Sequence, residues 1–193
     1  MVETDSHKND DSGRGTALLR FKFQDGKKPS GKKFLTGSST ITAATDPINK
    51  RIVIRRKEGG KFTYRLFSLE AAAQGDFSAP LAKFTEPDLS SKDVTFQGYT
   101  IFGQYLYTLD GTGHDDADDI NSYVTRINMK TGKIADRALT KAGNSLIFRE
   151  PEGMAVYRTS GGETRLCIGL GSHNKVGGPD RWANVYYKNK LIP

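Results

Sequence analysis

The sequence predicts an all-β protein built from repeated antiparallel sheets, and two observations carry this prediction. The first is a repeat: the stretch Thr95–Asp110, TFQGYTIFGQYLYTLD, recurs in looser form downstream around Gly153 and upstream around Thr42. In each copy a short apolar run, a turn and a second run rich in β-branched and aromatic residues follow one another, as in two paired, half-buried strands. The second is the period: successive copies lie about 55 residues apart, which is typical of β-propeller blades.

A third strand candidate completes each unit, at 62–69, 122–128 and 184–188. Three or four short strands per unit fit one propeller blade. We therefore expect a single domain over 1–193, a partial β-propeller of about three to three and a half blades made of antiparallel four-stranded sheets. The expected blades cover approximately 34–84, 95–140 and 148–193, after a remnant of a preceding blade at 16–33 and a polar loop or frayed terminus at 1–15.

Turn-forming residues separate these predicted strands. Thr16–Gln24 alternates apolar and basic residues and predicts a strand, which the hairpin signal Asp25-Gly26 ends. Pro47 and Asn49 suit a tight turn between two strands. Three consecutive alanines before Gly75 predict one short helical turn that the glycine ends.

Composition excludes several classes of protein. The 193 residues are 36% hydrophobic, enough for a core, and no run approaches the roughly 20 apolar residues of a membrane helix. Residues 1–15 contain no apolar segment, so no signal peptide is expected there. The single cysteine, Cys167, lies in a predicted strand and is expected to be a buried, inert thiol.

The net charge of +7 suggests an anionic polymer as partner. Lysine and arginine gather between Arg14 and Lys33 and again between Lys50 and Arg65. A cell-wall phosphate polymer and nucleic acid are both candidates, but RNP sequences, zinc-finger spacing and a basic recognition helix are absent, so nucleic acid is disfavoured. A merely solvated basic face is the simpler alternative.

Motifs for catalysis and metal binding are weak. Four aspartates beside His114, at 115, 116, 118 and 119, suggest calcium, yet the EF-hand spacing fails, and a solvated acidic loop is the simpler interpretation. The sequence contains no G-x-S-x-G, H-E-x-x-H or C-x-x-C motif. No cofactor is predicted, and the three histidines, His7, His114 and His173, all fall in expected loops.

The repeat itself suggests a ligand site. If the units superpose, Gln97 and Glu152 occupy equivalent places just before the glycine that opens the innermost strand. Innermost strands border the central channel of a propeller, where ligands usually bind. We expect ligand contacts from Gln97 and Glu152.

The succession FQGYTIFGQYLYTLDG, a strand ending in TGK, LTKAG and FREPEGMAVYR resembles one known family. This is the β-propeller shared by teichoic acid biosynthesis protein C-like proteins and phage receptor-binding or baseplate proteins, with helveticin J-type bacteriocins as more distant relatives. The resemblance covers about residues 3–187 and implies a five-bladed propeller that recognises wall teichoic acid or another surface glycopolymer. It also implies an extracellular or virion-associated location. Relative to that family, about the N-terminal half is missing.

Two functions remain open. The first is a non-catalytic binding module for an anionic cell-wall polymer, with arginines such as Arg149 holding phosphates and Tyr99, Trp182 or Tyr186 packing on sugar rings. The alternative is a metal-dependent lactonase or phosphoesterase, in which Glu152 of a P-E-G opening ligates a cation; a helveticin-like bacteriocin is a further alternative. Since an incomplete ring exposes strand edges, we expect self-association or a second chain that supplies missing blades.

Overall fold

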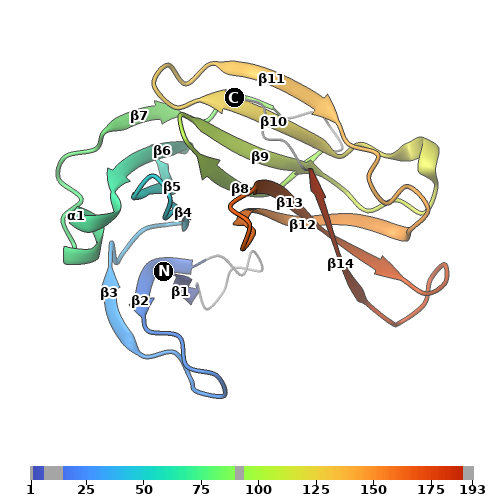
Figure 1. Cartoon of the computed structure of the whole chain (residues 1–193), viewed down its shortest axis with the longest axis horizontal. Coiled ribbons are helices and arrows are strands. Elements are labelled where there is room, and N and C mark those ends of the chain that lie inside the picture. The colour runs from blue at the N-terminus through green and yellow to red at the C-terminus, as the bar shows by residue number, and fades with distance from the viewer. Residues whose placement is uncertain (1, 7–14, 90–93, 189–193) are drawn as a thin grey trace. The chain divides into compact units, whose positions relative to one another are not determined.

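The computed structural model describes residues 2–6, 15–89 and 94–188, and the regular secondary structure in these ranges is almost entirely β-strand (Figure 1). The helices within them are α1 (Leu69–Gln74) and the 3-10 turn η1 (Ala117–Asp119), and neither is long and apolar enough to cross a membrane. The all-β prediction is confirmed. The strands are β1 (Val2–Ser6), β2 (Gly15–Phe21), β3 (Gly31–Phe34), β4 (Ile41–Asp46), β5 (Arg51–Glu58), β6 (Lys61–Ser68), β7 (Ala82–Thr85), β8 (Thr95–Phe102), β9 (Tyr105–Gly111), β10 (Tyr123–Asn128), β11 (Ile134–Leu139), β12 (Ile147–Arg158), β13 (Thr164–His173) and β14 (Trp182–Lys188).

These strands form four antiparallel sheets. Two of them have four strands, in the orders β4-β5-β6-β7 and β11-β10-β9-β8, and two have three, β1-β2-β3 and β12-β13-β14. Neighbours in each sheet are consecutive along the chain, so each sheet is an up-and-down meander. In the described ranges no sheet closes into a barrel, and the meanders are consistent with blades of a partial β-propeller.

The chain divides into two compact units. Unit 1 comprises residues 1–86 and 129–132, and unit 2 comprises 87–128 and 133–193. In unit 1, Leu18 of β2 packs with Ile41, Ile52 and Ile54 of the following sheet, which joins the two sheets through one apolar core. Helix α1 ends as expected, because Gly75 adopts a left-handed conformation and closes its last turn.

In unit 2 the sheets β8–β11 and β12–β14 approach most closely at two glycines. A Cβ placed on Gly98 of β8 would lie 3.1 Å from the Cα of Gly153 in β12. Beside this contact Leu109, Ile168 and Leu170 form one buried apolar cluster of the unit. The two first strands therefore approach closely at the backbone, and a side chain at position 98 would force the neighbouring strand to shift.

Strand register confirms the sequence repeat. Thr42 pairs with Arg55, Gly98 with Leu109, and Gly153 with Gly169, so each opening lies in the first strand of its sheet and pairs with the second strand. The pairing shifts between Phe96 and Gly98 in β8 and between Pro151 and Gly153 in β12. Gln97 and Glu152 are thus the extra residues of two equivalent β-bulges.

Three expectations from the sequence need correction. The predicted loop at 1–15 is wrong at residues 2–6, which form β1 and pair with β2, because extended polar residues can complete a sheet edge. Four strands per sheet are found in only two of the four sheets, within the described ranges. His173 is the last residue of β13 rather than part of a loop, while His7 lies outside the described residues.

The glycine contact in unit 2 can be tested by adding one methyl group. Gly98→Ala should lower the free energy of unfolding by about 1–3 kcal/mol, since the neighbouring backbone must move to admit the Cβ. Gly161→Ala is the control, because its Cβ would meet only Thr159 Oγ1 at 3.8 Å, and it should change stability by less than about 0.5 kcal/mol. Urea denaturation measures both, and equal midpoints for the two variants would contradict the close approach.

Candidate binding cleft

A cleft of about 380 Å³ lies within unit 2, between the outer strands of its two sheets. Strands β9, β10 and β11 supply one wall, and β13 and β14 supply the other. The segment that follows β11 closes one end. The lining residues are Tyr107, Val124, Arg126, Asp136, Ala138, Leu139, Thr140, Lys141, Ala142, Leu166, Ile168, Tyr186, Tyr187 and Lys188.

The cleft has an apolar floor and a charged rim. Val124 and Tyr186 pack against the buried cluster of Leu109, Ile168 and Leu170, and they give the cleft an apolar surface on which the flat face of a sugar ring can lie. Three cations, Arg126, Lys141 and Lys188, line the cleft with one anion, Asp136. The side chains of Lys141 and Lys188 are exposed, so the rim carries an excess of accessible positive charge.

Tyr107 at the base of the cleft is buried, and burial raises the pKa of its phenol above the usual value, against the opposing effect of the Arg126 cation. The phenol therefore stays neutral near pH 7 and can act as a hydrogen-bond donor. The cationic rim above this buried phenol suits a ligand that carries negative charge.

Of the residues predicted as ligand contacts, Tyr186 lies in this cleft and Arg149 lies behind it. Arg149 is only 1% exposed. Its guanidinium donates to Ser122 Oγ at 2.7 Å and to the carbonyl oxygens of Ala142 at 2.7 Å and Thr140 at 3.1 Å. Burial lowers the pKa of Arg149, and the nearby Tyr186 opposes this shift. The protein's own oxygens occupy this cation, so it does not face a ligand.

Arg149 instead shapes the cleft. The two carbonyl groups that it holds flank Lys141, and residues 140–142 all line the cleft. Its backbone N–H donates to the His114 carbonyl at 2.9 Å, which ties β12 to the loop after β9. Arg149 is thus a positioning residue for one cationic edge of the cleft. The sequence predicted Arg149 as a ligand contact, whereas the structure places its guanidinium against protein oxygens, because its burial depends on distant segments.

The two bulge residues differ in their surroundings. Gln97 is half-buried, and its side-chain Nε2 donates to the Gly111 carbonyl at 3.1 Å. Glu152 is exposed; partial desolvation and the neighbouring Glu150 raise the pKa of its carboxyl, while Arg181 opposes the shift. Arg181 contacts Glu150 at 3.5 Å. Neither bulge residue lines the cleft.

The remaining predicted aromatic contacts also lie outside the cleft. Tyr99 is 8% exposed and packs against Phe96 with ring centroids 6.1 Å apart, so little of its ring is accessible. Trp182 is 61% exposed at the start of β14. Tyr186 is therefore the one predicted aromatic contact that lies among the cleft residues.

The acidic loop carries no cation site that the structure supports. Asp115, Asp116, Asp118 and Asp119 are exposed, and among the described residues no group of three histidine, cysteine or acidic side chains is placed to hold a metal ion. Asp115 accepts a hydrogen bond from the Phe148 backbone at 3.0 Å, and Asp116 accepts one from Asp118 within η1 at 2.9 Å. These carboxylates organise the loop.

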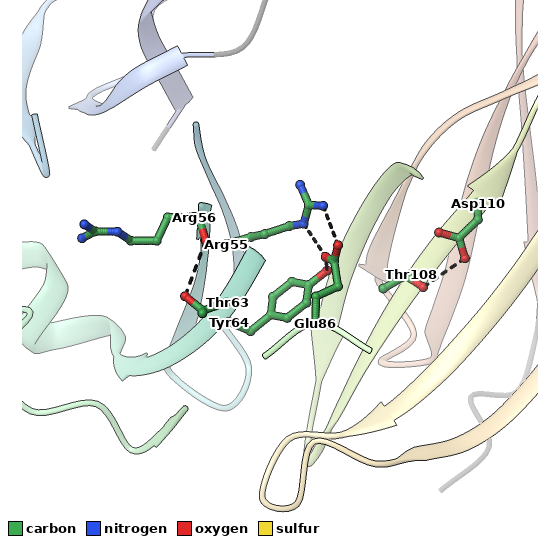
Figure 2. Close-up of polar contacts among 7 residues, drawn as sticks. All are labelled: Arg55, Arg56, Thr63, Tyr64, Glu86, Thr108 and Asp110. Carbon is green, nitrogen blue, oxygen red and sulfur yellow. Dashed lines mark hydrogen bonds and ion pairs between the residues drawn. The ribbon is translucent and has the colours of Figure 1, made fainter. Parts of the chain in front are cut away.

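Sequence analysis missed two buried polar networks. In unit 1, Arg55 contacts both carboxylate oxygens of Glu86, at 2.5 and 2.7 Å, and Tyr64 donates to the same carboxylate at 2.5 Å (Figure 2). Burial alone would lower the pKa of Arg55, yet the hydrogen bond to Glu86 raises it overall. The sequence signal for this network is an arginine, Arg55, inside the apolar run of β5. Its partner Glu86 lies 31 positions farther along the chain, so no local pattern links the two.

The second network belongs to unit 2. Asp110 is within 3.5 Å of the Thr108 hydroxyl, as Figure 2 shows, and Arg137 contacts Asp110 at 2.9 Å. Both networks satisfy buried charges on sheet faces, which is where an unpaired ion would be costly. We infer that these two networks stabilise their units and do not bind a ligand, since each carboxylate already has an arginine partner.

No family model matches the chain, and no curated protein matches it either.

The positioning role of Arg149 predicts a stability effect. Arg149→Met should lower the free energy of unfolding by about 3 kcal/mol or more, because three buried oxygens lose their donor. Arg158→Met is the control, since Arg158 is exposed and should tolerate the change within about 0.5 kcal/mol. Urea denaturation compares them, and an undisturbed midpoint for Arg149→Met would leave direct ligand contact as the role of this residue.

The raised pKa of Glu152 predicts how stability depends on pH. A carboxyl with a raised pKa favours the folded state while protonated, and this contribution is lost as the pH rises from the usual carboxyl range towards neutrality. Glu152→Gln should therefore melt up to about 2 °C higher than wild type at pH 7, and at the same temperature near pH 3. Melting curves followed by circular dichroism at both pH values measure the difference. A lower melting temperature for Glu152→Gln at pH 7 would disagree with the sign.

Proposed function

We propose that this protein is a non-catalytic binding module for an anionic cell-wall glycopolymer such as teichoic acid. One observation carries the proposal: the cleft of unit 2 combines an apolar floor that includes Tyr186 with a predominantly cationic rim. Sugar rings have apolar faces and polar edges, and a phosphate-linked polymer adds regularly spaced negative charge. The cleft offers a complementary surface for each of these features.

In the proposed complex a sugar ring lies on Tyr186 and the neighbouring apolar floor. Phosphates on either side contact Lys141 and Lys188 as point charges. Asp136 accepts hydrogen bonds from sugar hydroxyls at the opposite edge. Exposed ion pairs are worth only about 0.2–1 kcal/mol each, so a single repeat binds weakly and attachment to a polymer depends on repeated contacts.

The sequence adds a second line of support. Residues 148–158, FREPEGMAVYR, resemble the phage receptor-binding and teichoic acid biosynthesis protein C-like family. This segment contains Arg149, which positions the edge of the cleft that carries Lys141. The module would thus serve a receptor-binding or baseplate protein, or a related wall-associated protein, by holding it on the polymer without cleaving it.

The cationic rim can be tested by charge reversal. Lys141→Glu/Lys188→Glu should reduce binding to teichoic-acid-bearing cell walls at least tenfold at low salt, about 1.4 kcal/mol, because two attractive contacts become repulsive. Lys175→Glu is the matched control: this lysine is also exposed in unit 2 but lies outside the cleft, so the loss should be much smaller. Sedimentation of the protein with purified walls measures the bound fraction.

Added salt should weaken wild-type binding, since screening acts on exposed charges. Walls stripped of their anionic polymers should retain little protein. Failure of the wild type to bind intact walls at low salt, or equal losses for the double variant and Lys175→Glu, would refute the proposal.

A further inference from the structure

The net charge of the chain belongs to unit 1. Unit 1 contains 17 lysine and arginine residues against 10 aspartate and glutamate residues, whereas unit 2 contains 12 of each. The whole surplus of +7 is therefore in unit 1. The cleft lies in unit 2, which is neutral as a whole. An anionic polymer should accordingly meet a second attractive surface, on unit 1, that the cleft does not explain.

Part of this surplus gathers on one face of the sheet β4–β7. We call it the Glu58 cluster, and its members are Arg56 and Glu58 of β5, Lys61 and Arg65 of β6, and Lys83 of β7. Strand register places them side by side, because Glu58 pairs with Lys61 and Arg65 pairs with Lys83. Arg56 points away from the neighbouring Arg55 (Figure 2). The cluster and the Arg55–Glu86 network therefore lie on opposite faces of the sheet.

The cations of the cluster share one carboxylate. Arg65 Nη2 and Arg56 Nε lie 2.7 and 3.1 Å from Glu58 Oε1, and Lys83 Nζ lies 3.6 Å from Glu58 Oε2. Burial alone would raise the pKa of the Glu58 carboxyl, yet the hydrogen bond from Arg65 and the charge of Arg65 lower it overall. Glu58 is thus ionised near pH 7, and within the described ranges no other carboxylate contacts these cations. With the exposed Lys61, four cations face one anion.

The cluster also contains hydrogen-bond donors that lack an acceptor. The Nε atoms of Arg56 and Arg65 are shielded from solvent, and neither donates a hydrogen bond to any described residue. Arg56 Nε lies close to Glu58, but its N–H is not aligned with the carboxylate. Donors left without an acceptor are costly. Because both arginines lie on paired strands, their positions are fixed before any ligand arrives.

The surroundings of the cluster disfavour nucleic bases as ligands. The aromatic side chains nearest along β6 and β7 are Phe62, Tyr64 and Phe84, and strand alternation places all three on the opposite face. Phe62 stacks there against Arg55. Single-stranded nucleic acid binds by stacking its bases on exposed rings, and this face of β6 and β7 offers none among the described residues. Two guanidinium groups and two ammonium groups instead match the oxygens of a phosphate.

We propose that the Glu58 cluster is a second binding site, which holds phosphate groups of the anionic glycopolymer separately from the cleft of unit 2. The choice of polymer rests on the proposed function, whereas the affinity for phosphate does not. Arg56 and Arg65 donate to phosphate oxygens, and Lys61 and Lys83 add charge. Glu58 holds the cations together when no ligand is bound, and it competes with the phosphate for them.

Inorganic polyphosphate tests the site, since it offers phosphates without sugars or bases. Arg56→Gln/Lys83→Gln removes two cations but keeps the close Arg65–Glu58 pair, so the fold should persist. This variant should bind polyphosphate at least tenfold more weakly than wild type at low salt. Isothermal titration calorimetry measures both proteins, and circular dichroism confirms that the variant folds. A wild-type protein that does not bind polyphosphate would overturn the proposal.

A matched variant separates a local site from diffuse attraction. Lys22→Gln/Lys28→Gln removes the same charge from unit 1, at exposed lysines between β2 and β3. Its polyphosphate affinity should fall much less than that of Arg56→Gln/Lys83→Gln. Equal losses would mean that only the overall charge of unit 1 matters, and would overturn the site.

Removing the internal anion should have the opposite effect on binding. Glu58→Gln leaves the cations to repel one another, so it should melt at a lower temperature than wild type in phosphate-free buffer. Polyphosphate should then raise its melting temperature by more than it raises that of wild type, because no carboxylate competes. Glu70→Gln is the control, since Glu70 is an exposed acid of unit 1 on α1 and should show the wild-type increase. An increase for Glu58→Gln no larger than that of wild type would contradict competition for shared cations.

Competition experiments identify the polymer. Lys141→Glu/Lys188→Glu disables the cleft, and purified wall polymer should still displace polyphosphate from it, more effectively than a DNA duplex of equal phosphate content. A duplex that competes better would overturn the choice of a glycopolymer. Because polyphosphate binding is measured without cell walls, the two proposals can fail separately. A protein that binds polyphosphate through the cluster but does not bind intact walls would refute the proposed function and support the phosphate site.

Discussion

The close approach of Gly98 to Gly153 determines the geometry of unit 2. Where these two glycines meet, the first strands of both sheets touch at the backbone. Twisted sheets that touch at one edge diverge towards the other, because successive strands rotate relative to each other. The divergence is filled near the contact by Leu109, Ile168 and Leu170 and left open farther out, between β11 and β14. We infer that the cleft follows from this close backbone contact, which a larger residue at position 98 would push apart.

Arg149 fixes the position of the segment that closes one end of the cleft. The segment after β11 lies where the two sheets diverge. The buried guanidinium of Arg149 holds it by donating hydrogen bonds to the carbonyl groups on both sides of Lys141. Among the described residues no carboxylate pairs with its charge, and burial lowers its pKa, so three hydrogen bonds offset the cost of desolvation. A buried cation of this kind fixes one geometry for the cationic rim, which is useful where ligand phosphates must be matched in position.

The sequence predicted what depends on local pattern. Alternation and turn residues indicated most strands, and the spacing of Thr42, Gly98 and Gly153 predicted three units whose first strands contain these residues. Features that depend on contacts between distant segments were not predicted. Strand β1 is too polar to show the apolar alternation that predicts a strand. The burial of Tyr99 and Arg149 depends on elements that are distant in the sequence. The cleft residues come from five strands and one connecting segment, and no single window of sequence contains that combination.

Strand alternation gives the sheet β12–β14 two different faces. Ile168 and Tyr186 point to the cleft and core, while Cys167 and Val185 point the other way, so Cys167 is half-buried rather than buried as expected. The cleft depends on exposed charges that are worth only about 0.2–1 kcal/mol each. Firm attachment to a repeating polymer therefore requires several such weak contacts at once, because linking sites raises the apparent affinity by a factor set by their effective concentration.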